Sequence, residues 1–152
     1  MDELGFIGAL VAGTFMILLI IFIAAFVLSL LIYVYRSLAF MYIGKKTGDN
    51  LAPLAWIPYV GNAIVAYRAS GMHWWPWIFV GLYLVIMFPA MIFEALILQI
   101  IGVLSGLVYG VFFLVWLWKL FEKANWPGWM ALLYIIPIVN LVVLGMVAWM
   151  KR

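Results

Sequence analysis

The chain contains no cysteine, few charged residues and no polar stretch long enough to form a water-soluble domain. Of its 152 residues, only 9% are charged and 71% are hydrophobic. Without cysteine, disulfides, thiolate metal ligands and Cys nucleophiles are excluded. Soluble domains carry about 25% charged residues, so this much apolar surface requires lipid as its solvent. We therefore predict a single membrane domain over residues 1–152.

The few charges and the single histidine also limit the chemistry available to the chain. The net charge of +3 comes from cations near expected helix ends, which indicates membrane lipids rather than nucleic acid as partners. Gly-rich phosphate loops, paired carboxylates and clusters of metal ligands are lacking, and His73 alone cannot form a closed metal site. The sequence predicts a protein that is not an enzyme and has no cofactor.

Long apolar stretches predict an all-α polytopic membrane protein with three transmembrane helices. The first stretch, Gly5 to Tyr35, is longer than the ~30 Å hydrocarbon core requires. The second, Trp77 to Ala124, is long enough for two spans joined by a turn near Glu94 to Gln99. Glu94 is the only acid inside the apolar part of that run, before Glu122 at its end, so it is either a residue of the outer turn or a buried proton or cation site.

One phrase occurs twice in the chain. An apolar helix ends in Lys45-Lys46 and is followed by a polar turn and the sequence Ile57-Pro58-Tyr59-Val60-Gly61-Asn62. A second apolar helix ends in Glu122-Lys123 and leads in the same way to Ile136-Pro137-Ile138-Val139-Asn140. Two copies of one unit predict an internal duplication, with repeat-like units at about residues 31–77 and 109–152.

Each copy contains an apolar segment broken by proline. Because proline lacks an N–H and clashes with the preceding turn, we expect the carbonyls of Leu54 and Leu133 to be free. A bare carbonyl in hydrocarbon costs several kcal/mol. The asparagine after each proline is either a structural staple for that carbonyl or part of a polar site between the two breaks. The candidate positions are Pro58, Asn62, Pro137 and Asn140.

The distribution of cations predicts the orientation. Arg36, Lys45 and Lys46 follow the first helix, which places this end in the cytoplasm and the N-terminus outside. If both Pro-broken segments enter the membrane and return, all eight Lys and Arg residues are cytoplasmic. We therefore favour re-entrant segments. The alternative is short spans, and if only the second segment crosses, the C-terminus lies outside.

Two further sets of residues are candidates for contacts within the membrane. A face of small residues on the last long helix permits close approach of another helix, either the first helix or another subunit. This face consists of Gly102, Gly106 and Gly110. The candidate contacts to lipid headgroups are Arg68, Lys119 and Lys123.

Four phrases of the chain are characteristic, namely Gly71–Trp77, Trp118–Ala124, Trp126–Leu132 and Ile136–Asn140. They resemble a known family, a domain of unknown function in small prokaryotic integral membrane proteins. In some bacteria this domain precedes a signal peptidase I domain. Asn125 stands where the family usually has glycine, and the chain lacks the Ser–Lys pair of the peptidase. The resemblance implies a prokaryotic cytoplasmic membrane protein and brings no assigned activity.

Two functions fit these observations. The first is an accessory or scaffold subunit of a larger membrane complex, with other membrane subunits or a second copy as partners. It rests on the lack of polar machinery and on the small-residue face. The alternative is a transporter or a lipid- or small-molecule-binding protein with a site between the two Pro-broken segments.

Overall fold

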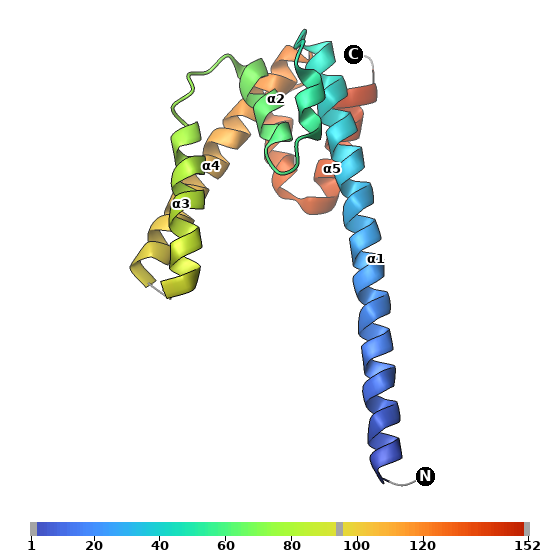
Figure 1. Ribbon diagram of the computed structural model, residues 1–152. Coiled ribbons are helices and arrows are strands. Elements are labelled where there is room, and N and C mark those ends of the chain that lie inside the picture. The colour runs from blue at the N-terminus through green and yellow to red at the C-terminus, as the bar shows by residue number, and fades with distance from the viewer. Residues whose placement is uncertain (1–2, 94–95, 151–152) are drawn as a thin grey trace. The chain divides into compact units, whose positions relative to one another are not determined.

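The computed structural model describes residues 3–93 and 96–150, and every regular element in that part of the chain is a helix (Figure 1). The predicted all-α class is therefore confirmed. By length and composition, two helices can cross a membrane, over Leu10–Lys46 and Leu96–Lys123. The chain divides into two compact units between Tyr35 and Arg36.

The first unit is the apolar part of helix α1, which covers Glu3–Lys46 and continues into the second unit. The described large hydrophobic side chains between Leu10 and Leu31 are exposed on all sides of this helix. The helix contains no proline and ends where Gly48 adopts a left-handed φ of 81°. The N–H of Thr47 donates to Ile43 O at 3.0 Å, and the N–H of Gly48 donates to Lys45 O at 3.1 Å.

The second unit is built around α4, Leu96–Lys123. Helix α3, Trp77–Phe93, runs alongside α4, and α2, Gly61–Ser70, packs against α4 near its C-terminal end (Figure 1). Helix α5, Pro137–Trp149, completes the unit. The largest fully buried side chains form one core in this unit and include Phe40, Ile43, Trp116, Leu117, Leu120, Phe121, Leu144 and Val147.

The segments that precede Pro58 and Pro137 are 3₁₀ helices, η1 at Ala52–Trp56 and η2 at Gly128–Ile135. The carbonyl of Leu54 accepts the N–H of Ile57 at 3.0 Å, and the carbonyl of Leu133 accepts the N–H of Ile136 at 3.1 Å. The prediction that these carbonyls are free was wrong. A 3₁₀ turn bonds each of these two carbonyls to the N–H of the residue before the proline, so neither of them depends on the missing proline N–H.

The two halves of the second unit share a pattern of burial. Helices α1 and α4 end at Lys46 and Lys123, and the same positions are buried when counted back from each lysine. These are Ala39, Phe40, Ile43 and Gly44 in α1 and Trp116, Leu117, Leu120 and Phe121 in α4. Counted forward from Asn62 and Asn140, the shared buried positions are Val65, Ala66 and Ala69 in α2 and Val143, Leu144 and Val147 in α5.

Each long helix packs against the short helix of the other half. Tyr67 of α2 lies edge-on to Trp116 of α4, with ring centroids 5.4 Å apart. Tyr42 of α1 lies beside Trp149 of α5, with ring centroids 6.2 Å apart. Aromatic pairs at these separations add to the energy of area burial. Because each long helix packs against the short helix of the other half, the two halves share one core.

The small-residue face of α4 packs on α3. Gly102 is buried, and a Cβ added to Gly106 would lie 3.4 Å from the ring of Tyr83 in α3. A Cβ added to Gly110 would meet nothing within 4 Å. Gly106 therefore packs against α3, a helix that the prediction had not considered as the partner.

We predict that Gly61→Ala destabilises the protein. A Cβ at this position would meet the backbone carbonyl oxygens of Leu54 and Ala55, the latter at 2.6 Å, so η1 or α2 would have to shift. Overpacking against backbone costs about 1–3 kcal/mol, which corresponds to a loss of several degrees in thermal melting in detergent. Gly110→Ala is the matched control and should leave the melting temperature unchanged or raised. Equal melting of the two variants would contradict the close approach of α2 to η1.

Candidate functional site

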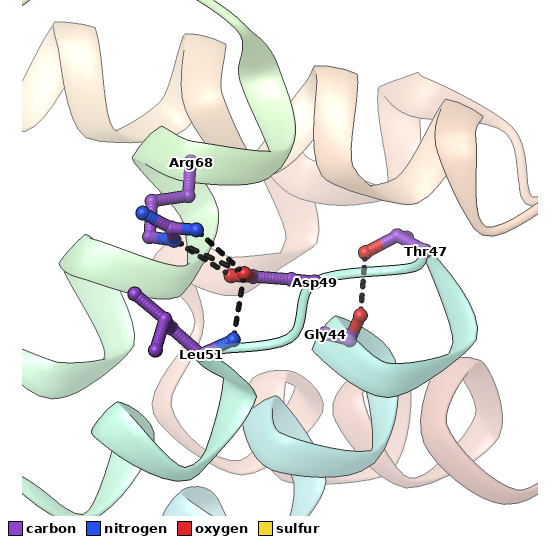
Figure 2. A network of polar contacts seen from close by, with 5 residues as sticks. All are labelled: Gly44, Thr47, Asp49, Leu51 and Arg68. Carbon is purple, nitrogen blue, oxygen red and sulfur yellow. Dashed lines mark hydrogen bonds and ion pairs between the residues drawn. The ribbon is translucent and has the colours of Figure 1, made fainter.

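An ion pair connects the loop after α1 to the end of α2 (Figure 2). Nε of Arg68 donates to both carboxylate oxygens of Asp49, at 3.0 and 3.1 Å, and Nη2 lies 3.0 Å from Oδ1. Asp49 Oδ1 also accepts the backbone N–H of Leu51 at 3.0 Å. The Asp49 side chain is only 7% exposed, whereas that of Arg68 is 40% exposed. The pair therefore closes the segment of residues 50–67 into a loop whose two ends meet.

Asp49 was not among the predicted site residues. A single acid in a polar loop has no periodicity or spacing that indicates its partner. The available signal was its position, three residues before the start of η1, where Asp commonly accepts a backbone N–H two residues further on. That local bond holds the carboxylate in place, and the tertiary fold then brings Arg68 to it.

The carbonyls at the helix ends around this ion pair already have partners. Ser70 Oγ donates to Tyr67 O at 2.6 Å, and the N–H of Gly71 donates to Arg68 O at 3.4 Å. At the end of α1, Thr47 Oγ1 donates to Gly44 O at 2.9 Å (Figure 2). The end of α4 is closed in the same way, because the N–H groups of residues 124–126 donate to the carbonyls of residues 120–122. The groups left to interact with a ligand are therefore mainly the cations.

A polar pocket of about 390 Å³ opens beside the ion pair. It collects residues from three separate parts of the chain, namely the loop after α1, the end of α2 and the end of α4. Its lining residues are Gly48, Asp49, Tyr67, Arg68, Ala69, Gly71, Met72 and Lys123. Of the predicted headgroup contacts, Arg68 and Lys123 thus lie in one pocket, with one acid between two cations.

At the matching position in the other half of the second unit, where α1 ends beside α5, the lysine is bonded to backbone carbonyls. Lys46, which ends α1 as Lys123 ends α4, donates to the carbonyls of Val147 and Met150 at 3.3 and 3.1 Å. Counted from Asn140 and Asn62, those residues match Ala69 and Met72 of the pocket. Met146 and Trp149 stand there where the pocket has Arg68 and Gly71. In this alignment, Arg68 and Gly71 beside the polar pocket correspond to the apolar residues Met146 and Trp149 at the end of α5.

The charges at the pocket influence one another. Burial raises the pKa of the Asp49 carboxyl, but the hydrogen bonds from Arg68 and Leu51 and the charges of Arg68 and Lys123 outweigh it. The pKa of Asp49 is therefore below its ordinary value of 3.8. The hydrogen bond to Asp49 raises the pKa of Arg68. Both groups of the ion pair are charged at neutral pH.

The third predicted headgroup contact, Lys119, lies elsewhere. It lines an apolar groove of about 440 Å³ between α4 and η2, together with residues such as Trp118, Glu122 and Leu132. Glu122 accepts the indole N–H of Trp118 at 2.6 Å. The expected cluster of Arg68, Lys119 and Lys123 is therefore only partly formed. Lys119 and Lys123 are one turn apart on the same side of α4, yet they line different cavities.

A third cavity adjoins the polar pocket. It has a volume of about 330 Å³ and is lined by Leu54, Ile64, Tyr67, Arg68 and Trp77. Its walls are mainly apolar, and it shares Tyr67 and Arg68 with the polar pocket. Trp77 is held in place by stacking on Trp116, with ring centroids 5.5 Å apart.

The two asparagines after the prolines have different surroundings. Asn140 Nδ2 donates to the carbonyl of Tyr134 at 3.3 Å, which is the stapling role predicted for it, although the acceptor is a neighbour of the predicted one. The side-chain oxygens of Asn62 and Asn140 are buried without a hydrogen-bond partner among the described residues. Neither asparagine lines any of the cavities described above. Glu94, the candidate proton or cation site, lies outside the described residues.

Arg36 is a further, half-buried cation that the predicted site did not include. Its guanidinium donates to the hydroxyl of Tyr134 and lies 5.3 Å from the centre of that ring. The Tyr134 ring packs edge-on against Phe40 and Phe113. This contact joins the second-unit part of α1 to η2 and serves the packing of the core.

Comparisons with protein-family models, with curated proteins and with solved structures found no match to this chain. The family resemblance drawn from the sequence phrases stays a prediction.

We predict that acid weakens the fold through Asp49. Because the pKa of Asp49 is lowered in the folded state, its contribution to stability is present above the ordinary pKa and is lost as pH falls through the lowered value. Melting temperature measured from neutral to acid pH should therefore fall less steeply for Asp49→Asn than for the unmodified protein. Arg68→Gln should flatten the profile in the same way, and the double variant should add little. Parallel profiles for all four proteins would contradict the ion pair.

Proposed function

We propose that this protein is a small integral membrane protein that binds a monoanionic phosphate group, as on a lipid headgroup, in the polar pocket between Arg68 and Lys123. The observation that carries the proposal is the convergence of these two cations beside Asp49 at the charged end of an apolar helix. Basic pockets at such helix ends bind phospholipid headgroups. Lys123 has no hydrogen bond or ion pair with any of the residues described, so its ammonium is available.

The charge of the pocket favours a monoanion. Asp49 neutralises Arg68 through a two-oxygen hydrogen bond, which leaves the single positive charge of Lys123 in excess. The corresponding lysine of α1, Lys46, donates instead to the backbone carbonyls at the end of α5. The polar pocket therefore differs from the matching position at the end of α5, because its lysine remains available to a ligand.

The proposed topology has three spans, α1, α3 and α4, with re-entrant segments between α1 and α3 and after α4. The Asp49–Arg68 ion pair supports re-entry of the first segment, because its ends lie too close together for a ~30 Å crossing between them. The bonds from Lys46 to the end of α5, together with the position of Lys123 near Asp49, support re-entry of the second. The shared burial pattern supports an internal duplication. All described cations then lie on the cytoplasmic side.

This topology predicts the labelling of single cysteines. The chain has no native cysteine, and Asn50, His73 and Met150 are exposed. Cysteines at these positions should all react with a membrane-impermeant maleimide from the cytoplasmic side only. Ile97→Cys, near the other end of α4, is the control and should react from outside. Labelling of Met150→Cys from outside would instead mean that the last segment crosses.

We predict that Lys123→Gln weakens retention of dioleoyl-phosphatidylglycerol by about fivefold, since a cation near an anionic headgroup contributes about 1 kcal/mol. The measurement is native mass spectrometry of the detergent-purified protein with added lipid. Lys119→Gln removes the same charge from the same helix but faces the other groove, so its effect should be smaller. An equal loss in both variants would indicate general surface attraction and would overturn the assignment of the pocket.

A second candidate function is the accessory or scaffold subunit. It is favoured by the first unit, a single apolar helix whose large side chains between Leu10 and Leu31 are exposed on every face. Purification at native expression level in a mild detergent, followed by mass spectrometry, tests it. Stoichiometric protein partners support this function. Recovery of a monomer that carries only lipid rejects it and leaves the lipid-binding proposal.

A further inference from the structure

The polar pocket and the apolar cavity beside it share a wall. Tyr67 and Arg68 line both, although one cavity is rich in charge and the other is mainly apolar. Both residues suit a boundary of this kind. Tyr67 has an apolar ring with a polar tip, and Arg68 has an apolar stem with a charged head. A ligand that occupies the polar pocket therefore has apolar surface directly next to it.

The apolar cavity leads away from the charged end of the helices. Ile64 precedes Arg68 by one turn on the same face of α2, about 6 Å along the helix axis. Leu54 of η1 and Trp77 of α3 form the other walls. Ile64 and Trp77 are half-buried, and the cavity is open rather than enclosed. Its direction places it on the hydrocarbon side of the polar pocket in the proposed topology.

The wall of the apolar cavity is held in place by stacked rings. Trp77 stacks on Trp116, and Tyr67 lies edge-on to both, with ring centroids 5.7 Å from Trp77 and 5.4 Å from Trp116. Each pair adds about 0.5–1.5 kcal/mol to the energy of area burial. These contacts fix the shape of the cavity without any occupant, so a chain that enters it loses little energy to rearrangement of the protein.

We propose that the ligand of the polar pocket is an amphiphile, a phospholipid whose phosphate lies between Arg68 and Lys123 and one of whose acyl chains lies against Leu54, Ile64 and Trp77. This inference rests on the proposed function and deepens it, because it names the class of ligand. A free phosphate or a soluble phosphate ester would use the polar pocket alone. The apolar cavity beside the polar pocket, which shares Tyr67 and Arg68 with it, distinguishes the amphiphile from those alternatives.

The test compares three probes on detergent-purified protein by thermal melting. Dioleoyl-phosphatidylglycerol carries both the phosphate and the chains, glycerophosphoglycerol carries the headgroup alone, and dioleoyl-phosphatidylcholine carries the chains with a zwitterionic headgroup. Ile64→Trp fills the apolar cavity with a larger side chain. Leu107→Trp makes a similar change at an exposed position of α4 outside the described cavities and is the matched control.

We expect phosphatidylglycerol to raise the melting temperature of the unmodified protein and of Leu107→Trp more than either other probe does. In Ile64→Trp the response to this lipid should fall to that given by the soluble headgroup, while the response to the soluble headgroup itself is retained. Lys123→Gln should lose both responses. The retained response to the headgroup shows that Ile64→Trp is folded and that its polar pocket is intact.

The failures of the two proposals give different results. If Ile64→Trp responds to phosphatidylglycerol as the unmodified protein does, or if headgroup and lipid act equally, the acyl-chain cavity is rejected and the phosphate pocket stands. If Lys123→Gln keeps both responses, the phosphate pocket itself is rejected. Phosphatidylcholine also has an anionic phosphate, but its choline cation balances that charge. If it stabilises as strongly as phosphatidylglycerol, the pocket does not recognise the net negative charge of the headgroup, and the assignment of an anionic amphiphile is overturned.

Discussion

The ion pair between Asp49 and Arg68 is the contact on which the arrangement of the second unit depends. It joins the loop after α1 to the end of α2, so η1 and α2 fold back as one closed segment. Asp49 is nearly buried and is held by both Arg68 and the backbone of Leu51. Removal of Arg68 would leave the nearly buried Asp49 carboxylate without its partner, which is more costly than loss of a solvated pair. The pair also sets one wall of the polar pocket.

The 3₁₀ turns before Pro58 and Pro137 reduce the cost of placing a proline in an apolar segment. A proline in a helix removes one donor, and lipid offers no water to replace it. In both copies the chain changes to a 3₁₀ turn before the proline, and the carbonyls of Leu54 and Leu133 keep a partner. The cost of the break is thereby reduced locally. The asparagines are then not needed for these two carbonyls, and Asn140 instead bonds the carbonyl of Tyr134.

Because each long helix packs against the short helix of the other half, the lysines that end α1 and α4 have different surroundings. Each long helix ends in a lysine that lies near the end of the short helix of the other half. At α5 the lysine is bonded to carbonyls, and Met146 and Trp149 stand where α2 and the residue after it have Arg68 and Gly71. Near α2 these residues and Asp49 leave the lysine beside an open pocket. A few side chains thus distinguish the end of α5, where the lysine makes a packing contact, from the end of α2, where the lysine lies beside an open pocket.

The sequence by itself determined the helical class and the two long apolar helices, because these depend on composition and on short local patterns. It also identified Arg68 and Lys123 as cations near helix ends. Only the tertiary structure decided that these two share a pocket while Lys119 faces another groove, since helical periodicity defines a face but not what lies opposite it. For the same reason the sequence did not predict the packing of Gly106 on Tyr83. It also did not predict the ion pair of Asp49 with Arg68, which is 19 residues away in the chain. The closed carbonyls at the prolines escaped prediction because the choice between an α-helix and a 3₁₀ turn depends on hydrogen bonds that form only in the folded chain.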